Sequence, residues 1–292
     1  MVGGDASFAI LEARGLLTVG GEDRAEFLQG LISNDIHRVQ PDRAIYAALL
    51  TPQGKYLFDF FIAERDGALL LETERARIDT LIKRLTMYKL RAKVELSDVS
   101  GDWRVVALWG DGALSTLGLS EAGAAKAAGD GVAFADPRLE AAGARLLLAP
   151  GDPLPDGDEA DADAYDAHRL ALGLPDGSRD LVLEKSILLE SGFDELHGVD
   201  WKKGCYMGQE LTARTKYRGL VKKRLVPVSI DGPLPEPGTE VMAEGKSVGE
   251  IRSGQGGLAL ALIRLEALEQ PGAPLRAGDA AVTPHRPDWA EF

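Results

Sequence analysis

The only cysteine of the chain, Cys205, lies in a segment whose residue types suit chemistry with an anionic ligand. Lys202 and Lys203 precede it, and nearby cations favour the thiolate over the thiol, which would make the sulfur reactive. Gly204 and Gly208 permit a tight backbone and the close approach of a ligand. The alternative is that Cys205 is a small buried apolar residue, the commoner fate of a lone cysteine.

Polar side chains follow the cysteine directly. Gln209 and Glu210 could form hydrogen bonds with the edge of a heterocycle, and Arg214 and Arg218 could hold a carboxylate or phosphate. A helix that begins near Gln209 would point its first free N–H groups at an anion. The segment therefore predicts a site for an anionic, partly aromatic ligand.

Charge is spread unevenly along a chain whose formal net charge is −13. The range 152–166 carries seven acids and no base, whereas 202–224 carries eight bases and one acid. The basic range indicates an anionic ligand or partner, or else a solvated loop that pairs with the acidic range. An acidic protein repels phosphate, so we expect no direct nucleic-acid partner.

Composition bounds the class of protein. With 45% hydrophobic and 27% charged residues, it is typical of a globular protein. No apolar run approaches the roughly 20 residues that a membrane-spanning helix needs, so we expect no membrane partner. One cysteine and no secretory signal at the N-terminus predict a cytoplasmic protein. One cysteine and four scattered histidines predict no resident metal.

Hydrophobic periodicity predicts an α+β body followed by a small β-barrel. A β-hairpin is expected over 44–63 with Gly54 in its turn, and Asp23 with Glu26 resembles a capping box before a short helix. Further elements of the body are expected as a strand over 8–19 broken near 12–14, helices over 74–87 and 160–172, and strands over 68–71, 94–96, 104–108 and 145–148.

After Arg224 the sequence consists of short apolar runs between Gly and Pro turns, which favours an all-β module. These runs are 225–230, 240–242, 247–251, 257–263 and 280–282. We therefore predict two domains, the α+β body over 1–219 and the barrel over 220–292.

The segment Lys203-Gly-Cys-Tyr-Met-Gly-Gln-Glu210 resembles the K-G-C-Y-x-G-Q-E signature of the YgfZ family, folate-binding relatives of the glycine-cleavage aminomethyltransferase. Glu26–Asp35 resembles the family's F-L-Q-G-x-x-T-N-D segment, Tyr46–Asp59 its second block, and 241–265 its C-terminal barrel. The resemblance covers nearly the whole chain and is greatest to the branch with the mitochondrial iron–sulfur assembly member.

The resemblance implies an aminomethyltransferase-like body of ferredoxin-like units around a folate channel, with the barrel after it. It implies a tetrahydrofolate-linked role, or one linked to another reduced folate, in assembling or repairing iron–sulfur clusters. The implied partners are iron–sulfur assembly proteins and [4Fe–4S] client enzymes. Two alternatives remain open, a folate-dependent aminomethyl- or methyltransferase and a folate-binding adaptor without catalysis.

The resemblance also implies roles for single residues. Cys205 would be the functional thiol, and Asp59 the acid near the reacting folate nitrogens; the alternative for Asp59 is a strand-end residue facing water. The residues implied in folate binding are Tyr46, Asp59, Lys203, Gly204, Tyr206, Gly208, Gln209, Glu210 and Arg214.

Two positions differ from the family pattern. Phe58 replaces the first acid of the transferase's Asp-Asp pair, and Ala171 stands where folate-binding relatives carry Glu in an R-L-E-A-G-like segment. Glu184 or Glu190 could supply a carboxylate in its place.

Overall fold

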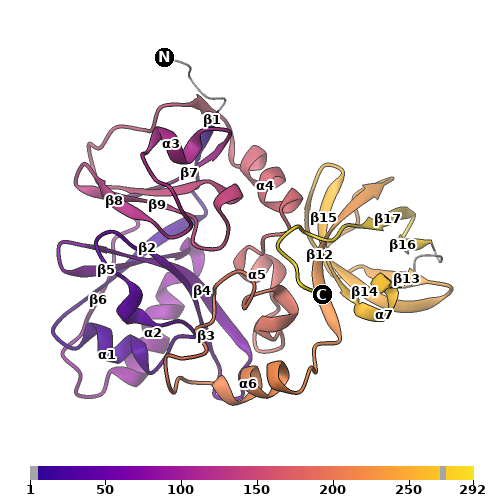
Figure 1. The fold of residues 1–292 in the computed structure, drawn as a ribbon, viewed down its shortest axis with the longest axis horizontal. Coiled ribbons are helices and arrows are strands. Elements are labelled where there is room, and N and C mark those ends of the chain that lie inside the picture. Colours follow the sequence, from indigo (N-terminus) through magenta and orange to yellow (C-terminus); the bar gives the residue numbers. More distant parts are fainter. Residues whose placement is uncertain (1–5, 270–273) are drawn as a thin grey trace. The chain divides into compact units, whose positions relative to one another are not determined.

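The computed structural model describes residues 6–269 and 274–292, which cluster into two compact units (Figure 1). Unit 1 comprises the chain up to Leu50, Leu57–Tyr165 and Leu196–Met207, and unit 2 comprises Thr51–Tyr56, Asp166–Glu195 and Gly208–Phe292. No helix among the described residues is long and apolar enough to cross a membrane. The first five residues, on which the predicted lack of a secretory signal partly rests, lie outside the described residues.

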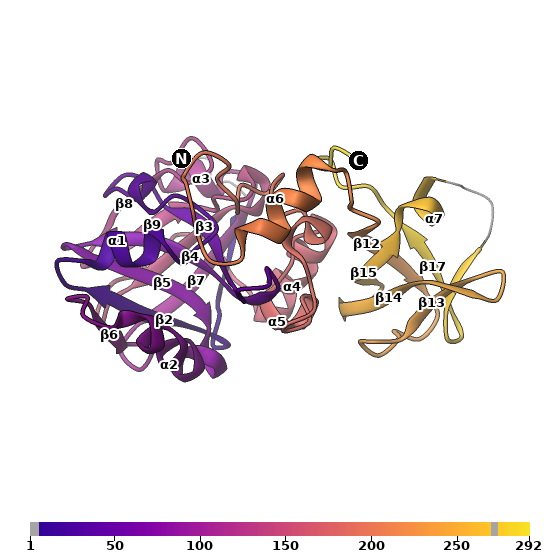
Figure 2. The same ribbon diagram turned by 90° about the horizontal axis from the view of Figure 1, so that it is seen from below.

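A five-stranded sheet with the order β3-β4-β5-β2-β6 forms one half of unit 1. Leu28 of α1 (Arg24–Gln29) and Leu81 and Leu85 of α2 (Ile78–Lys89) pack in one apolar cluster with residues from its strands, so these helices cover one face (Figure 2). The strands are β2 (Arg14–Gly20), β3 (Ile45–Leu50), β4 (Tyr56–Arg65), β5 (Ala68–Glu74) and β6 (Glu95–Asp98). The predicted hairpin is confirmed, as is the break in the first predicted strand.

A six-stranded sheet with the order β11-β1-β7-β10-β9-β8 forms the other half of unit 1. The short helix α3 (Ala113–Thr116) contributes to the apolar cluster of this sheet. The sequence did not predict β8 and β9, whose alanine-rich segments carry weak strand propensity. The strands are β1 (Ala6–Ile10), β7 (Arg104–Gly110), β8 (Ala125–Ala128), β9 (Gly131–Ala135), β10 (Ala144–Leu148) and β11 (Asp158–Glu159).

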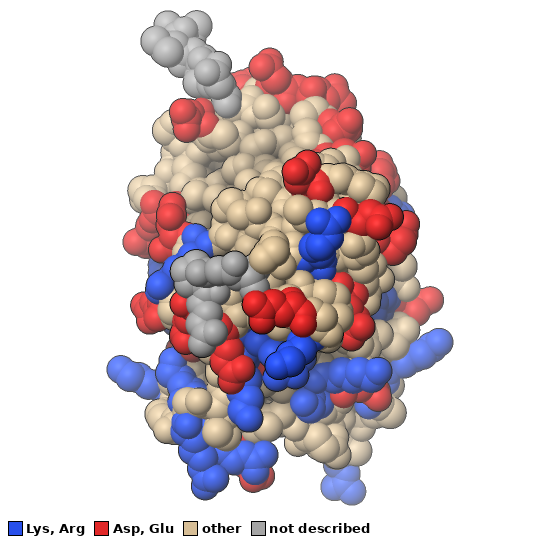
Figure 3. All heavy atoms as spheres, turned by 90° about the vertical axis from the view of Figure 1, so that its right-hand side faces the viewer, with Lys and Arg blue, Asp and Glu red and all other residues tan. Residues whose placement is uncertain are grey.

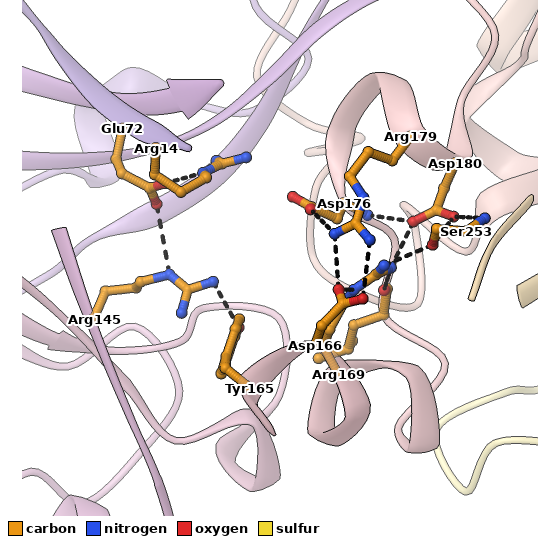
Figure 4. Close-up of polar contacts among 11 residues, drawn as sticks. Arg14, Glu72, Arg145, Tyr165, Asp166, Arg169, Asp176, Arg179, Asp180 and Ser253 are labelled. Atoms are coloured by element: carbon orange, nitrogen blue, oxygen red, sulfur yellow. Dashed lines mark hydrogen bonds and ion pairs between the residues drawn. The ribbon is translucent and has the colours of Figure 1, made fainter. Parts of the chain in front are cut away.

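Buried charges connect the two sheets of unit 1 (Figure 4). Glu72 of β5 is fully buried and pairs with Arg14 of β2 and, at 3.6 Å, with Arg145 of β10. The Arg145 guanidinium also donates a 2.6 Å hydrogen bond to the Tyr165 hydroxyl. A carboxylate removed from water in this way is stable only while its cationic partners remain.

Unit 2 contains a closed six-stranded barrel with the order β12-β15-β14-β13-β16-β17. The predicted barrel is confirmed, and its apolar cluster includes Val228, Ile251 and Ile263. The sequence did not predict β16, a strand of three residues. The strands are β12 (Lys223–Asp231), β13 (Glu240–Ala243), β14 (Lys246–Gln255), β15 (Leu258–Arg264), β16 (Leu275–Ala277) and β17 (Ala280–Pro284), with the short helix α7 (Leu265–Glu269) after β15.

The predicted capping box is wrong. The side chain of Asp23 makes no capping bond to α1 and instead accepts a 2.7 Å hydrogen bond from the backbone N–H of Lys93. The capping-box rule considers only residues three positions apart, so it does not predict a hydrogen bond between residues 70 positions apart.

Arg169 organises the part of unit 2 next to the barrel (Figure 4). It lies on α4 (Ala162–Ala171), is 2% exposed, and bonds to Asp166 at 2.7 Å, to Asp180 at 2.6 Å and to the Ser253 hydroxyl at 2.6 Å. Asp180 ends α5 (Gly177–Asp180), and Ser253 belongs to β14. One guanidinium therefore fixes two helices to a barrel strand.

Replacing this guanidinium should destabilise the protein strongly. Arg169→Met leaves Asp180 buried and without its cation, so we expect a loss of about 3–5 kcal/mol in the free energy of unfolding. Urea unfolding followed by circular dichroism measures the change. The exposed Arg218→Met is the control, with an expected change of about 0.5 kcal/mol or less; equal effects of the two substitutions would contradict the role assigned to Arg169.

Candidate functional site

Cys205 is an exposed free thiol on a loop of unit 1. The loop ends at Met207, and α6 (Gln209–Tyr217) begins two residues later, as the sequence predicted. Gly204 and Gly208 have φ values of +95° and +83°, a conformation that favours glycine. The alternative of a buried structural cysteine is therefore wrong.

Lys203 fastens this loop to the end of α1. Its ammonium donates to the backbone carbonyls of Gln29 at 2.8 Å and of Ile32 at 2.5 Å. In return, the Gln29 amide donates to the Lys203 carbonyl at 3.2 Å, and the N–H of Met207 donates to the carbonyl of Gly30 at 3.1 Å. The Lys203 ammonium is therefore engaged with backbone carbonyls at the end of α1 and just after it.

Two buried side chains after α1 extend this attachment. The Ser33 hydroxyl donates to the carbonyl of Gly198 at 2.6 Å, and the Asn34 amide donates to the carbonyls of His197 and Tyr46 at 2.8 Å each. The N–H of Asp200 donates to the Ser33 carbonyl at 3.1 Å. The two motifs singled out in the sequence, 26–35 and 203–210, are thus partners in space.

We name this set of hydrogen bonds, made by Gln29, Ser33, Asn34 and Lys203, the loop clamp. Sequence reasoning missed the roles of Ser33 and Asn34, although both lie in the quoted segment Glu26–Asp35. The signal was the polar pair Ser33 and Asn34 shortly after α1, because polar side chains after a helix commonly form hydrogen bonds with backbone groups.

Burial lowers the pKa of Lys203 from 10.5 to about 8, against the opposing effect of Asp35 and Asp200. Because the folded pKa lies below the unfolded one, the unfolded chain binds more protons between pH 8 and pH 10.5. The contribution of Lys203 to the free energy of unfolding therefore rises as the pH increases through that window.

Lys203→Met should remove this dependence. We expect the free energy of unfolding of the wild type, minus that of the variant, to rise between pH 8 and pH 10. Urea unfolding at several pH values measures the difference. A flat difference across the window would contradict the buried position of the ammonium.

Tyr46 and Asp59 form a buried pair in unit 1. The Tyr46 hydroxyl donates to the Asp59 carboxylate at 2.8 Å, and the two residues are 0% and 3% exposed. Burial, and next the charge of Asp59, raise the pKa of Tyr46 well above its usual value. The Thr73 hydroxyl donates to the Asp59 carbonyl at 2.8 Å. The alternative in which Asp59 faces water is wrong.

Phe58 lies next to Asp59 on β4 but belongs to the apolar cluster that contains α1 and α2. The Arg77 guanidinium lies 4.1 Å from the centre of its ring. Successive strand residues point to opposite faces, so position 58 is directed into the helix-covered core. A carboxylate there would be buried among apolar side chains.

A small pocket of about 150 Å³ adjoins the loop clamp within unit 1. Asn34, Tyr46 and His197 line it together with Arg38 and Arg43. Arg38 also pairs with Asp200 of the cysteine loop at 3.3 Å. Tyr46 connects this pocket with Asp59, because it lines the first and bonds to the second.

Tyr206, another predicted ligand residue, is buried on the cysteine loop of unit 1, where the Lys203 ammonium lies 5.2 Å from the centre of its ring. The other predicted ligand residues, Gln209, Glu210 and Arg214, lie on α6 in unit 2. Glu210 and Arg214 are exposed and Gln209 is half-buried. The hairpin turn packs on the start of this helix, since a side chain at Gly54 would meet Leu211 and the carbonyl of Gly208. The uneven charge predicted from the sequence is visible on the surface, where basic side chains gather on the lower part of the face drawn in Figure 3.

The two candidate substitutes for the family glutamate differ in environment. Ala171 itself is exposed at the end of α4, and Glu184 is exposed as well. Glu190 is half-buried, and burial raises its pKa despite the charges of Lys223 and Lys55. Glu190 is therefore the more buried of the two candidates, and which of them serves as a substitute stays a prediction.

Among residues 6–269 and 274–292, no three His, Cys, Asp or Glu side chains gather as a metal site. The expectation that the protein holds no metal of its own stays a prediction. Cys205 alone supplies at most one ligand.

Comparison with solved structures identifies the fold. The glycine cleavage system aminomethyltransferase T from Bartonella henselae superposes with a TM-score of 0.76 at 15% identity, covering 99% of this chain and 87% of that chain. A family model described as the GCVT N-terminal domain matches residues 11–128, and one described as the CAF17 C-terminal beta-barrel domain matches 222–292. The protein therefore has the aminomethyltransferase fold with a C-terminal barrel, as predicted.

Sequence comparison identifies the family. The mitochondrial iron-sulfur cluster assembly factors IBA57 of Mus musculus and Homo sapiens are each 36% identical to this chain, covering 96% of it and 84% of the relative. A homologue from Mycosarcoma maydis is 33% identical and covers 87% of this chain and 72% of its own length. The chain belongs to the IBA57 family of iron–sulfur cluster assembly factors. The finer assignment to YgfZ stays a prediction.

The predicted cytoplasmic location is contradicted by these relatives, which are named mitochondrial proteins. A lone free cysteine indicates a reducing environment and does not distinguish one reducing compartment from another.

Proposed function

We propose that this protein assembles or repairs iron–sulfur clusters of [4Fe–4S] proteins through Cys205 and in conjunction with a reduced folate. The observation that carries the proposal is an exposed thiol on a loop held by the loop clamp. A solvent-accessible sulfur on a fixed backbone is suited to contact a cluster carried by another protein. Membership of the IBA57 family supports the same role.

In this proposal the thiolate supplies one ligand to a cluster, and a partner protein supplies the others. The cluster is cargo that passes between proteins. The loop clamp prevents the loop from moving when the thiol meets its partner, which limits the entropy lost on binding. The exposed bases of α6 would attract an acidic partner or an anionic cluster.

The residues of unit 1 fit a reduced folate in their chemistry. Tyr46 and Asp59 offer a hydroxyl and a carboxylate to a heterocycle with N–H groups, and Arg38 and Arg43 can pair with the carboxylates of its tail. When bound, the folate would supply one-carbon chemistry. Asp59 would hold or accept a proton at its carboxylate, and Tyr46 would orient that carboxylate.

An aminomethyl- or methyltransferase is the second candidate, favoured by the fold and by the Tyr46–Asp59 pair. The residue at position 58 argues against ordinary glycine cleavage, because Phe58 packs in the apolar core and supplies no carboxylate. Turnover of an aminomethyl-lipoyl donor protein would favour the transferase.

Cys205→Ser should abolish the assembly function. In cells that lack this protein, we expect the variant to leave [4Fe–4S] enzymes as inactive as the empty vector does, because a hydroxyl is a poor ligand for iron in a cluster. Enzyme assays in extracts measure the effect, and immunoblots check that the variant accumulates. Full rescue by Cys205→Ser would overturn the role of the thiol and favour a non-catalytic adaptor.

Asp59→Asn should weaken folate binding. Calorimetric titration of anaerobic protein with tetrahydrofolate should give micromolar affinity for the wild type, about −8 kcal/mol, and at least about tenfold weaker affinity for the variant. The exposed Asp66→Asn, after the same strand, is the matched control and should bind like the wild type. Absence of binding to the wild type would remove folate from the proposal and leave the role of Cys205 intact.

A further inference from the structure

Two exposed apolar side chains, Met87 and Leu90, lie at the end of α2 in unit 1 among basic residues, and we name them the α2 knob. Leu90 is 90% exposed and Met87 59% exposed. Four bases surround them in the sequence, and in the part of the chain that the structure describes none of the four forms an ion pair: Lys83, Arg84, Lys89 and Arg91.

The backbone at Leu90 has φ +43° and ψ −106°, a conformation that L side chains rarely adopt. Helices usually place glycine at such a stop, because a side chain there is strained. This leucine is strained and also exposed, so neither local conformation nor core packing explains its presence. An outlier of this kind points to a role outside the fold of the single chain.

A complementary surface lies elsewhere on the same unit. A pocket of about 320 Å³ is lined mainly by apolar side chains, among them Leu117, Leu146, Leu148 and Leu154. Because a cavity of about 150 Å³ holds a benzene molecule, this pocket has room for a leucine side chain. Two bases are near it: Lys126 donates to the carbonyl of Leu117, and Arg65 donates to the carbonyl of Gly129.

Acids dominate the chain beside this pocket. Asp156 lines the pocket, and the segment that follows is strongly acidic and solvent-exposed. Its exposed acids are Asp156, Asp158, Glu159, Asp161 and Asp163. The unit therefore carries an apolar knob with a basic surround and an apolar pocket with an acidic surround.

We propose that the α2 knob of one copy docks into this pocket of a second copy. The apolar side chains of the knob and of the pocket would bury each other, while the four bases of one copy face the five acids of the other. A second copy of the chain therefore accounts for both surfaces. The contact is heterologous, since different surfaces of the two copies meet. Both surfaces belong to unit 1, and the contact is weak and sensitive to salt.

Sedimentation velocity tests this proposal. The wild type should show a sedimentation coefficient that rises between about 1 μM and about 100 μM at low salt, and the rise should be lost in Leu90→Asp. Leu234→Asp, at an exposed leucine of unit 2, adds the same charge and should associate like the wild type. A wild type that stays monomeric throughout, or a Leu90→Asp variant that associates normally, would overturn the proposal.

Two further variants separate docking from folding. Leu90→Gly relieves the strained backbone and should unfold at a higher temperature than the wild type while losing self-association. Thr116→Trp fills the pocket from its exposed rim and should also be monomeric. A mixture of Thr116→Trp with Leu90→Asp retains one knob and one pocket, so it should form a one-to-one dimer; failure to do so would show that knob and pocket are not partners.

Discussion

The cysteine loop depends on buried hydrogen bonds that join it to the end of α1. Ser33, Asn34 and Lys203 donate hydrogen bonds to the backbone carbonyls of residues 197, 198, 29 and 32. An unsatisfied buried carbonyl costs about 1–3 kcal/mol, so the loop and the helix end stabilise each other. The thiol of Cys205 takes no part in these hydrogen bonds and is exposed.

The alternation of β4 places Phe58 and Asp59 in different environments. Phe58 and Asp59 point to opposite faces of one sheet, the first into the apolar cluster and the second toward Tyr46. Phe58 adds to the apolar core, whereas Asp59 accepts a hydrogen bond from Tyr46, whose ring centre lies 5.3 Å from the Arg138 guanidinium.

Unit 2 uses a different device, a dense ionic network around Arg169. Asp166 is held ionised by Arg179 and Arg169, which lower its pKa although burial raises it. The network replaces the apolar contacts that short helices such as α5 cannot supply. Ala171 lies two residues along the same helix and is exposed, so the network does not depend on it.

Local patterns in the sequence determined the hairpin, the barrel and the start of α6, because turn residues and alternation act within a few positions. They also singled out Cys205, whereas the segments 26–35 and 46–59 were singled out by the resemblance to the YgfZ family. They could not show that Ser33 and Asn34 hold the loop, that Asp23 serves Lys93, or that Asp59 is buried against Tyr46. Those facts were decided by the tertiary structure, since each depends on hydrogen bonds between residues that only folding brings together.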